Sequence, residues 1–359
     1  MKKSLALLII IHFSFTIMAQ QKLTIDSILA DYQGNGIPGA ALIIIKNGHP
    51  VYIKCYGYAD IEKNIPIYPV TNFRLASVTK QFTATAILQM VQNGKIKLGT
   101  TLTQVFPGFP DYGKKITIHH LLNHTSGLPD YENAVPDTAF NPQIKDRGVL
   151  EILLQTDSVY FEPGTKYRYS NSAYALLALI VEKYSNQSFA DYLKTHIFAP
   201  LQMNHTVVYE KGISTIDNRA FGYSEQEDQW ILSDQSSTSA VLGDGGIYSN
   251  LEDMFKWDQS LYTEKILTRQ YLDLASNFNV LNNGDTVHYG YGWHLKKTGN
   301  NEKAVFHTGS TTSFRNIYYR IPAKNFSLVL FTNRNRPQQK DMVVLAERIT
   351  AAFEETESK

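Results

Sequence analysis

Strand patterns stand at both ends of the chain, and this arrangement limits the possible folds more than any other feature. Near the N-terminus, GIPGAALIIIKNGHPVYIKCYGYAD predicts a β-hairpin with strands at 40–46 and 50–56 around an Asn47-Gly48 turn. From Tyr289 onward, strand patterns recur in YGYGWHL, AVFHTG, FRNIYYRI and FSLVLFTN. Because strands linked by short turns pair antiparallel, we expect one antiparallel sheet built from both termini.

Helical patterns fill the stretch between these strands. Apolar residues recur at helical spacing in 81–92, 118–123, 150–155, 172–184 and 189–198, and a last stripe spans 342–353. We therefore predict an α+β fold, in which helices flank an antiparallel β-sheet from both termini and an all-α insertion separates them. The predicted boundaries are 21–80 and 240–359 for the sheet domain and 81–239 for the mainly helical domain. Their junction is the expected cleft.

The first 20 residues, MKKSLALLIIIHFSFTIMAQ, have the build of a secretory signal peptide. Two lysines precede an apolar run, and the small residue Ala19 follows it. We expect export to the periplasm or the extracellular space. An uncleaved anchor is the alternative, although the run is shorter than the roughly 20 apolar residues that a membrane span needs. No later segment is apolar enough, so we expect no stable membrane span after signal removal.

Charge and cysteine content narrow the possible partners. The 34 lysines and arginines nearly balance the 33 aspartates and glutamates, so no overall field would draw the chain to nucleic acid. Cys55 is the only cysteine, which excludes an intramolecular disulfide and a CxxC metal site. A small-molecule or peptide substrate is therefore the expected partner.

A Ser-x-x-Lys pattern, Ser77-Val78-Thr79-Lys80, occurs once, where a loop enters the helix predicted near Thr79. Residues three apart share a helix face, so the ammonium of Lys80 can approach the hydroxyl of Ser77. A partly desolvated lysine has a lowered pKa and can help to take the serine proton. A helix cap followed by a solvated lysine is the alternative interpretation.

A partner for this pair is sought among four Tyr-x-Asn patterns: Tyr131 with Asn133, Tyr169 with Asn171, Tyr184 with Asn186, and Tyr248 with Asn250. The last two have sufficient roles at helix ends. Tyr131 lies in an irregular polar loop, for which we expect no rigid support. Tyr169 directly precedes a buried helix that would hold it in place at the cleft. We therefore select Tyr169 and Asn171.

A basic residue followed by Thr-Gly occurs twice within KTGNNEKAVFHTG. The first copy, Lys297-Thr298-Gly299, falls where a polar hairpin turn is expected between two strands. The second copy, His307-Thr308-Gly309, ends the apolar strand AVF and leads into small residues, so it can line a cleft. We select the second copy.

With these motifs together, the chain resembles the serine β-lactamase-like and DD-peptidase family, in its class C branch. The resemblance extends from about Pro38 to Asn333, and its motifs are FRLASVTKQFTA, GKIKL, LLNHTSGLPDY, FEPGTKYRYSNSAYALLALIVEKYS, GGIYSNLEDMFKW, YGYGW and FHTGS. It implies a β-lactamase/transpeptidase-like fold with the site between a sheet domain and a helical domain. It implies neither a metal nor an organic cofactor.

The resemblance also implies roles for the selected residues. Ser77 would be the acylated nucleophile, Lys80 would help to deprotonate it, and Tyr169 would act as general base and acid. The implied substrate-binding residues are Asn171, His307, Thr308, Gly309 and Ser310, with the backbone amides of Ser77 and Ser310 as the oxyanion hole. Arg315 follows the same strand and is a further candidate, because its planar fork suits a substrate carboxylate; a surface ion pair is the alternative.

Two departures bear on the substrate. Class C β-lactamases usually have lysine at the position of His307, whereas histidine resembles the DD-peptidases, D-amino-acid peptidases and esterases of the family. With an ordinary pKa near 6.5, His307 would be mostly neutral at neutral pH. Ser313 also stands where many relatives have glycine. His120 and His124 are spaced for zinc on a helix, but the glutamate of HExxH is missing, so no metal is expected.

We therefore expect an exported serine hydrolase that works through an acyl-enzyme on Ser77. The favoured activity is that of a D-Ala-D-Ala-type carboxypeptidase or D-amino-acid peptidase. An esterase or amidase of the same family is the alternative, followed by a class C-like β-lactamase. A non-catalytic peptidoglycan-binding module is the alternative from another functional class, and the complete set of Ser77, Lys80 and Tyr169 disfavours it.

Overall fold

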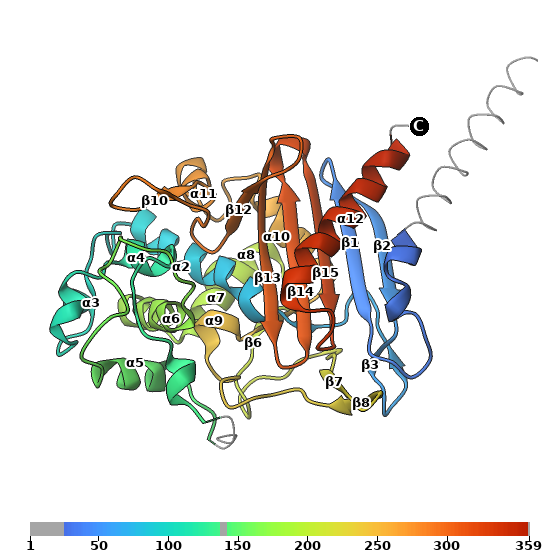
Figure 1. The fold of residues 1–359 in the computed structure, drawn as a ribbon, viewed down its shortest axis with the longest axis horizontal. Helices are drawn as coiled ribbons and strands as arrows, with labels where there is room; N and C mark the ends of the chain where they lie inside the picture. Colours follow the sequence, from blue (N-terminus) through green and yellow to red (C-terminus); the bar gives the residue numbers. More distant parts are fainter. Residues whose placement is uncertain (1–24, 137–141, 358–359) are drawn as a thin grey trace, which may run out of the picture.

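Strands from both ends of the chain form one six-stranded antiparallel sheet in the order β12-β13-β14-β15-β1-β2 (Figure 1). The computed structural model describes residues 25–136 and 142–357, so the predicted signal peptide at 1–20 lies outside the described residues. β1 pairs with β15, and Ile43 stands opposite Val329 in this pairing. The predicted sheet from both termini is confirmed. Its strands are β1 (Ala40–Lys46), β2 (His49–Tyr56), β12 (His294–Lys297), β13 (Lys303–Thr311), β14 (Phe314–Ile321) and β15 (Phe326–Thr332).

Both faces of the sheet are covered, which explains why β1 is apolar along almost its whole length. Leu42 belongs to a buried cluster that includes Ile349 of α12 (Gln339–Glu357), the helix that lies across one face in Figure 1. The next residue, Ile43, points to the opposite face and joins a cluster that includes Trp257 of α10 (Leu251–Ser260). Each fully buried side chain of this size stabilises the fold by about 1.5–3 kcal/mol.

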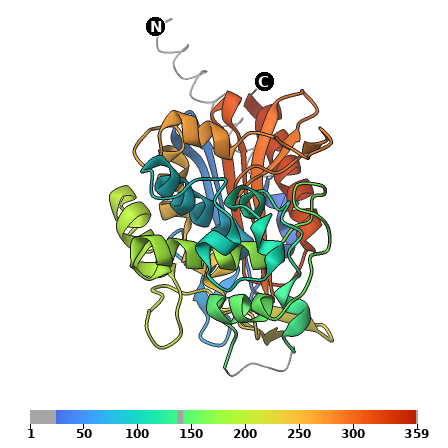
Figure 2. The ribbon, with the colours of Figure 1, turned by 90° about the vertical axis from the view of Figure 1, so that its left-hand side faces the viewer.

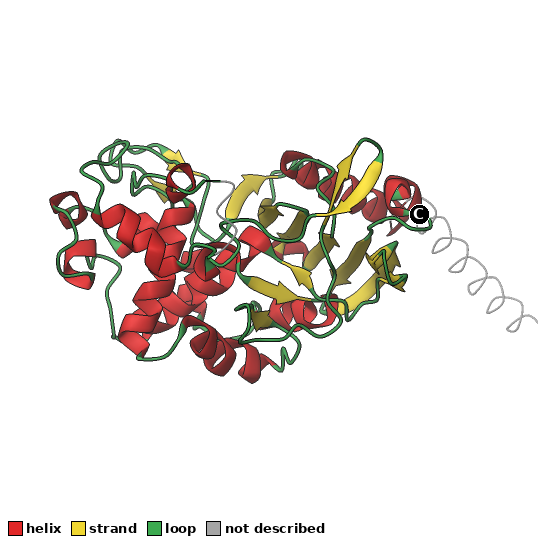
Figure 3. Ribbon diagram, turned by 90° about the horizontal axis from the view of Figure 1, so that it is seen from below, coloured by secondary structure: helices red, strands yellow, loops and turns green. Residues whose placement is uncertain are grey.

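The remaining helices gather beside the sheet, as the separate groups of helix and strand in Figure 3 show, and Figure 2 presents their outer side. The predicted helices at 81–92 and 172–184 are confirmed as α2 and α6. The helices of this group are α2 (Lys80–Gln92), α3 (Leu102–Val105), α4 (Ile118–Leu122), α5 (Asp146–Leu154), α6 (Asn171–Ser185), α7 (Phe189–Leu193), α8 (Ala199–Leu201), α9 (Leu242–Gly245) and α11 (Arg269–Ala275). Among the described helices, none is both long and apolar enough to cross a bilayer.

One hydrophobic core joins the helical group to the inner face of the sheet. Its buried members include Ile43 of β1, Phe82 of α2 and Leu177 of α6. Phe82 packs against Trp257 of α10, with 4.4 Å between the ring centroids. A short 3₁₀ helix, η2 (Ala76–Thr79), carries the chain from β5 (Phe73–Arg74) into α2. The N-terminal end of α2 is therefore held between the helical group and the sheet.

The structure corrects two details of the predicted elements and adds short strands to a third segment. Residues 289–293 of YGYGWHL are not strand, because Gly292 has a φ of +80° and approaches the backbone of Lys80 too closely for a side chain. The helix predicted at 150–155 begins already at Asp146, whose carboxylate accepts hydrogen bonds from α9 instead of capping its own helix. The stretch 81–239, predicted as mainly helical, also contains β6 (Val207–Val208), β7 (Tyr223–Gln226) and β8 (Gln229–Leu232).

Six short strands complete the fold. β9 pairs antiparallel with both β5 and β6. Through β9, the strand that precedes Ser77 is joined to the C-terminal part of the 81–239 stretch. These remaining elements are β3 (Tyr58–Asp60), β4 (Ile65–Pro66), β9 (Ile247–Ser249), β10 (Asn279–Val280), β11 (Thr286–Val287) and the already named β5.

Candidate active site

Ser77 lies in η2, half-buried, directly before the first turn of α2. The preceding residue, Ala76, has a φ of +49°, a conformation that non-glycine residues rarely adopt. Strain of this kind persists only where the surroundings enforce it. Here Leu75 donates its N–H to the carbonyl of Ile247 at 2.8 Å, and the carbonyl of Arg74 accepts a bond from Asn316 at 2.7 Å. The serine is thus presented on a firmly held turn.

Gly309 explains how β13 reaches this turn. A Cβ atom at Gly309 would lie 2.1 Å from the carbonyl oxygen of Leu75, so only glycine allows the strand to pass so close. The first copy of the motif differs, because Gly299 lies in the β12–β13 hairpin with nothing within 4 Å of a Cβ there. The structure therefore places the second copy, and not the first, beside Ser77.

Lys80 is fully buried and its ammonium is surrounded by oxygen atoms. Its Nζ donates to Ser77 Oγ at 3.1 Å, to Asn171 Oδ1 at 2.8 Å and to the backbone carbonyl of Asp244 at 2.8 Å. Burial lowers the pKa of Lys80 to about 8, and the negative charges of Asp244 and Glu132 oppose that shift. This burial excludes the alternative of a solvated lysine.

Tyr169 lies between Lys80 and a group of aromatic rings. The Lys80 Nζ is 4.9 Å from the centre of the Tyr169 ring. The Tyr169 hydroxyl is buried and makes no hydrogen bond of ordinary geometry within the described residues. Burial raises the pKa of Tyr169 well above its ordinary value, although the nearby Ser77 hydroxyl acts in the opposite direction. The phenol is therefore neutral at rest, and a buried hydroxyl without a partner is typical of functional sites.

Asn171 is the first residue of α6, so the helix fixes its position. Its Oδ1 accepts from Lys80, and its Nδ2 donates to Glu132 Oε1 at 2.9 Å. The preceding residue, Ser170, caps the helix by accepting from the N–H of Ala173. The Tyr-x-Asn pattern selected from the sequence is the one that meets Ser77 and Lys80.

His307 is fully buried, and both nitrogens of its ring are occupied. Nδ1 lies 2.7 Å from the carbonyl oxygen of Thr308, which can only accept, so Nδ1 carries the proton. Nε2 then accepts from the hydroxyl of Tyr289 at 2.8 Å. Burial lowers the pKa of His307 well below its ordinary value, and the nearby His294 and Lys80 lower it further. In this arrangement both ring nitrogens have protein partners, so no donor or acceptor of the ring remains for a substrate.

Ser310 shares a small pocket with Ser77. This pocket, of about 50 Å³, is lined by Arg74, Ala76, Ser77, Tyr131, Glu132, Asn171, Thr238, Asp244, Gly245, Ser310 and Thr311. Thr308, two residues earlier on β13, is buried and does not line this pocket. The shared pocket supports the proposal that the backbone amides of Ser77 and Ser310 form an oxyanion hole.

Comparison with known proteins agrees with this geometry. The sequence profile of the family described as Beta-lactamase matches residues 25–352. The chain is 34% identical over 331 residues to Penicillin-binding protein 4* of Bacillus subtilis, covering 88% of this chain and 71% of that protein. The chain belongs to the beta-lactamase family. It is also 30% identical to Protein flp of Staphylococcus aureus, covering 87% of this chain but only 63% of that protein.

Two solved structures with the same fold are similar to the chain. A penicillin-binding protein homologue from Pyrococcus abyssi, described as octameric, superposes with a TM-score of 0.79 at 26% identity, covering 93% of this chain and 77% of that one. A D-amino acid amidase from Ochrobactrum anthropi, complexed with L-phenylalanine amide, superposes with a TM-score of 0.78 at 25% identity, covering 94% and 99%. The chain is thus a serine hydrolase related to β-lactamases and penicillin-binding proteins.

Arg315 was a candidate because it follows the strand of the His307 motif, with a surface ion pair as the alternative. Its Nη1 donates to the carbonyl oxygens of Thr311 and Phe314, so the guanidinium folds back onto its own β13–β14 hairpin. It does not line the pocket beside Ser77. The arginine that does so is Arg74, which is 3% exposed and donates to Ser239 O at 2.7 Å.

Tyr131 and Asp244 also line the pocket beside Ser77, although we selected neither from the sequence. Tyr131 was expected in a loop without rigid support, yet it is 1% exposed and its hydroxyl donates to Asp244 Oδ2 at 2.9 Å. Burial raises the pKa of Asp244 to about 6, whereas the charge of Lys80 lowers it. In the sequence, Asp244 is marked only as a carboxylate inside the glycine-rich GDGG. Its contact with Lys80 uses the backbone carbonyl, which any residue would provide.

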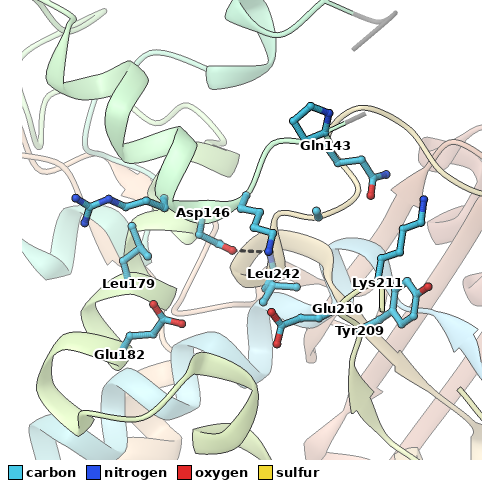
Figure 4. Close-up of a pocket in the computed structure, with 12 residues that line it drawn as sticks. Gln143, Asp146, Leu179, Glu182, Tyr209, Glu210, Lys211 and Leu242 are labelled. Carbon is cyan, nitrogen blue, oxygen red and sulfur yellow. Dashed lines mark hydrogen bonds between the residues drawn. The ribbon is translucent and has the colours of Figure 1, made fainter. Parts of the chain in front are cut away.

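A larger pocket lies at the start of α9 and contains none of the predicted site residues. It measures about 260 Å³ and is lined by parts of α5, α6, α9 and the 209–211 segment (Figure 4). Asp146 reaches from this pocket to accept the N–H groups of Leu242 at 2.8 Å and Gly243 at 3.0 Å. It thereby fixes α9, whose Asp244 carbonyl holds Lys80.

His120 and His124 each have a structural role. His120 Nδ1 accepts from the N–H of Thr117, and His124 Nδ1 accepts from the N–H of Ser170. Across 25–136 and 142–357, no group of three or more metal-ligating side chains gathers in one place. Ser313 donates its hydroxyl to the carbonyl oxygen of Ser233 at 2.6 Å, so it joins the hairpin to a neighbouring loop.

Proposed function

We propose that the protein hydrolyses peptide or amide bonds of D-amino-acid type through an acyl-enzyme on Ser77, as a D-Ala-D-Ala-type carboxypeptidase or a D-amino-acid peptidase. The observation that carries this proposal is the position of Lys80. Its Nζ lies 3.1 Å from Ser77 Oγ in a buried site that lowers its pKa to about 8. At neutral pH a useful fraction of such a lysine is uncharged and ready to accept the serine proton.

The acylation step follows from this arrangement. Ser77 Oγ attacks the substrate carbonyl while its proton passes to neutral Lys80. The Tyr169 phenol donates its proton to the leaving nitrogen as the C–N bond breaks, and Lys80 then reprotonates the phenol. The net result is one O–C bond formed, one C–N bond broken and one proton moved from serine to the amine. Water attacks the ester in the reverse sequence to release the acid.

The neutral His307 disfavours a β-lactamase. Its ring carries no permanent cation and both of its nitrogens are bonded within the protein. The likeness to a D-amino acid amidase over 94% of this chain favours amidase activity as the second candidate. A non-catalytic module is disfavoured, because a buried lysine that contacts a serine hydroxyl is costly to keep without a catalytic use.

The test is the intact mass of the purified protein after incubation with a penicillin, with Ser77→Ala as the control. We expect a lasting adduct on the wild type alone, since a penicillin mimics a D-Ala-D-Ala terminus. If the penicillin stays intact and no adduct forms, while a fluorophosphonate still labels Ser77, the proposal shifts to an esterase or amidase. If the fluorophosphonate also fails, the protein is a non-catalytic module.

We also propose that the protein is exported. The support is the N-terminal sequence, in which an apolar run follows two lysines and ends at Ala19. N-terminal sequencing of protein recovered from the periplasm or medium of an expressing bacterium tests this. A mature chain that begins near residue 20 or 21 is expected, and a chain that keeps its first residues in the cytoplasm would contradict export.

A further inference from the structure

Glu132 is an acidic residue at the mouth of the pocket beside Ser77. It lies in η4 (Tyr131–Ala134), is exposed, and lines the same pocket as Ser77 and Asn171. Its Oε1 accepts from Asn171 Nδ2 at 2.9 Å. Within the described residues, no lysine or arginine forms an ion pair with it; the nearby Arg168 pairs with Asp130 instead, at 2.6 Å.

This contact changes what Asn171 can offer to a substrate. Its Oδ1 is occupied by Lys80, and one hydrogen of Nδ2 points to the Glu132 carboxylate. A substrate with an acylated nitrogen would bring a carbonyl oxygen to this amide, next to a carboxylate that also only accepts. A substrate with a free ammonium would bring donors and a positive charge to the same place.

The other charges of the pocket do not cancel this effect. Lys80 is fully buried, and Arg74 is 3% exposed with Nε, Nη1 and Nη2 each bonded to protein oxygens. Asp244 is buried and accepts from Tyr131. Glu132 is therefore the charge that an entering substrate meets first, and a pocket of about 50 Å³ suits a group as small as an ammonium or a methyl.

We propose that Glu132 binds the free α-ammonium of the substrate residue that acylates Ser77, so that the enzyme prefers amides and peptides with a free N-terminal D-residue over N-acylated ones. This inference rests on the proposed function, and it selects the D-aminopeptidase or D-amino-acid amidase class within it. Glu132 is a specificity residue here, since Ser77, Lys80 and Tyr169 carry out the bond cleavage in either case.

The experiment compares D-alanine p-nitroanilide with N-acetyl-D-alanine p-nitroanilide as substrates of the full protein. We measure the ratio of the two kcat/KM values for the wild type, for Glu132→Gln and for Glu151→Gln. Glutamine keeps an acceptor for Asn171 but loses the charge. Glu151 is an exposed residue of α5 that pairs with Arg147 and does not line the pocket, so it controls for a change of net charge.

We expect the wild type and Glu151→Gln to prefer the free amine, and Glu132→Gln to lower that ratio about tenfold or more, the effect of losing a charged hydrogen bond. The ratio cancels the influence of Glu132 on the pKa of Lys80, which acts on both substrates alike. A ratio that stays the same in Glu132→Gln, or a wild type that prefers the acetylated substrate, overturns the inference.

A second measurement separates this inference from the proposed function. D-alaninamide and N-acetyl-D-alaninamide compete with a fluorophosphonate for Ser77, and protection from labelling gives the same ratio without any turnover. Labelling that is protected equally by both amides contradicts the role of Glu132 alone. A Ser77 that no fluorophosphonate labels contradicts the proposed function and, with it, this inference.

Discussion

The two sides of the candidate site handle charge in opposite ways. The polar side, made of Ser77, Lys80, Asn171 and Glu132, contains a buried ammonium that three oxygen atoms surround. The aromatic side, made of His124, Tyr289, His294 and His307, contains three histidines whose rings each contact the ring of Tyr289, and no cation. Burial and the charge of Lys80 lower the pKa of His294 to about 4, and the pKa values of the other two histidines are lowered as well.

Tyr169 stands between these two sides and contacts both. Its ring lies 4.9 Å from Lys80 Nζ and 4.3 Å from the ring of His124, measured to the ring centroids. Because the aromatic side is neutral, Lys80 is the group of these two sides that can exchange a proton with Ser77 at neutral pH. We infer from this difference that the polar side carries out proton transfer, whereas the aromatic side holds the neighbouring side chains in place.

The largest expected effect is therefore that of removing the Lys80 ammonium. We expect Lys80→Met to lower kcat/KM by about 10³-fold, because no other group can take the Ser77 proton. The melting temperature should change by only roughly a few degrees, since relief of a desolvated charge offsets the three lost hydrogen bonds. Lys303→Met, whose ammonium binds Ser276 O outside the pocket, is the matched control. Activity that survives Lys80→Met would instead assign the base to Tyr169 or to the aromatic side.

The second largest expected effect is that of removing the hydroxyl of Tyr169, which lies between the polar and the aromatic side. Tyr169→Phe should lower kcat/KM by about 10²-fold through loss of the proton donor to the leaving group. It should leave thermal stability unchanged or raise it, because the deleted hydroxyl is buried without a hydrogen bond. Kinetics with a good leaving group provide the check, since p-nitrophenyl esters need little proton donation. An equal loss on esters and anilides would show that Tyr169 does not act as that donor.

The pH dependence should report Lys80. Its uncharged form is the active one, so kcat/KM should rise about tenfold per pH unit and level off near pH 8, the lowered pKa of Lys80. Since folding lowers this pKa from 10.5, the resulting stability is present above pH 10.5 and is lost as the pH falls toward 8. As the pH rises from 8 to 10.5, the melting temperature of the wild type should therefore increase relative to that of Lys80→Met. A kinetic midpoint well below 6.5 would indicate one of the buried histidines instead.

The sequence predicts the parts of the molecule that depend on periodicity and on local motifs. The hairpin of β1 and β2, the helices α2 and α6 and the sheet joining both termini follow from apolar spacing and turn residues. The choice of Tyr169 among four Tyr-x-Asn patterns also agrees with the geometry, because Asn171 is the first residue of α6 and Tyr169 lies just before its N-cap. The surrounding strand and turn patterns likewise favoured the copy of the basic-Thr-Gly motif that ends at Gly309 over the copy that ends at Gly299.

Features that depend on backbone contacts between distant segments were not predictable. The carbonyl of Asp244 that holds Lys80 comes from a residue 164 positions away, and any side chain there would offer the same oxygen. Tyr131 was judged from its irregular loop, but its support comes from Asp244 across the fold. Arg315 was placed by its position on the chain, whereas its direction is set by the turn carbonyls beside it.

The smallest effect tests whether the aromatic side only fixes positions. His307→Gln should lower kcat/KM by less than about tenfold, because glutamine keeps one donor and one acceptor and the wild-type ring carries no charge to lose. The kinetic midpoint near pH 8 should stay in place, since it belongs to Lys80. If His307 instead served as a cation or gripped the substrate, this variant would lose activity as strongly as Tyr169→Phe and would shift the pH profile. Tyr289→Phe, which removes the bond to Nε2, should act in the same direction and more weakly, so the two variants together decide whether the ring's orientation or its charge matters.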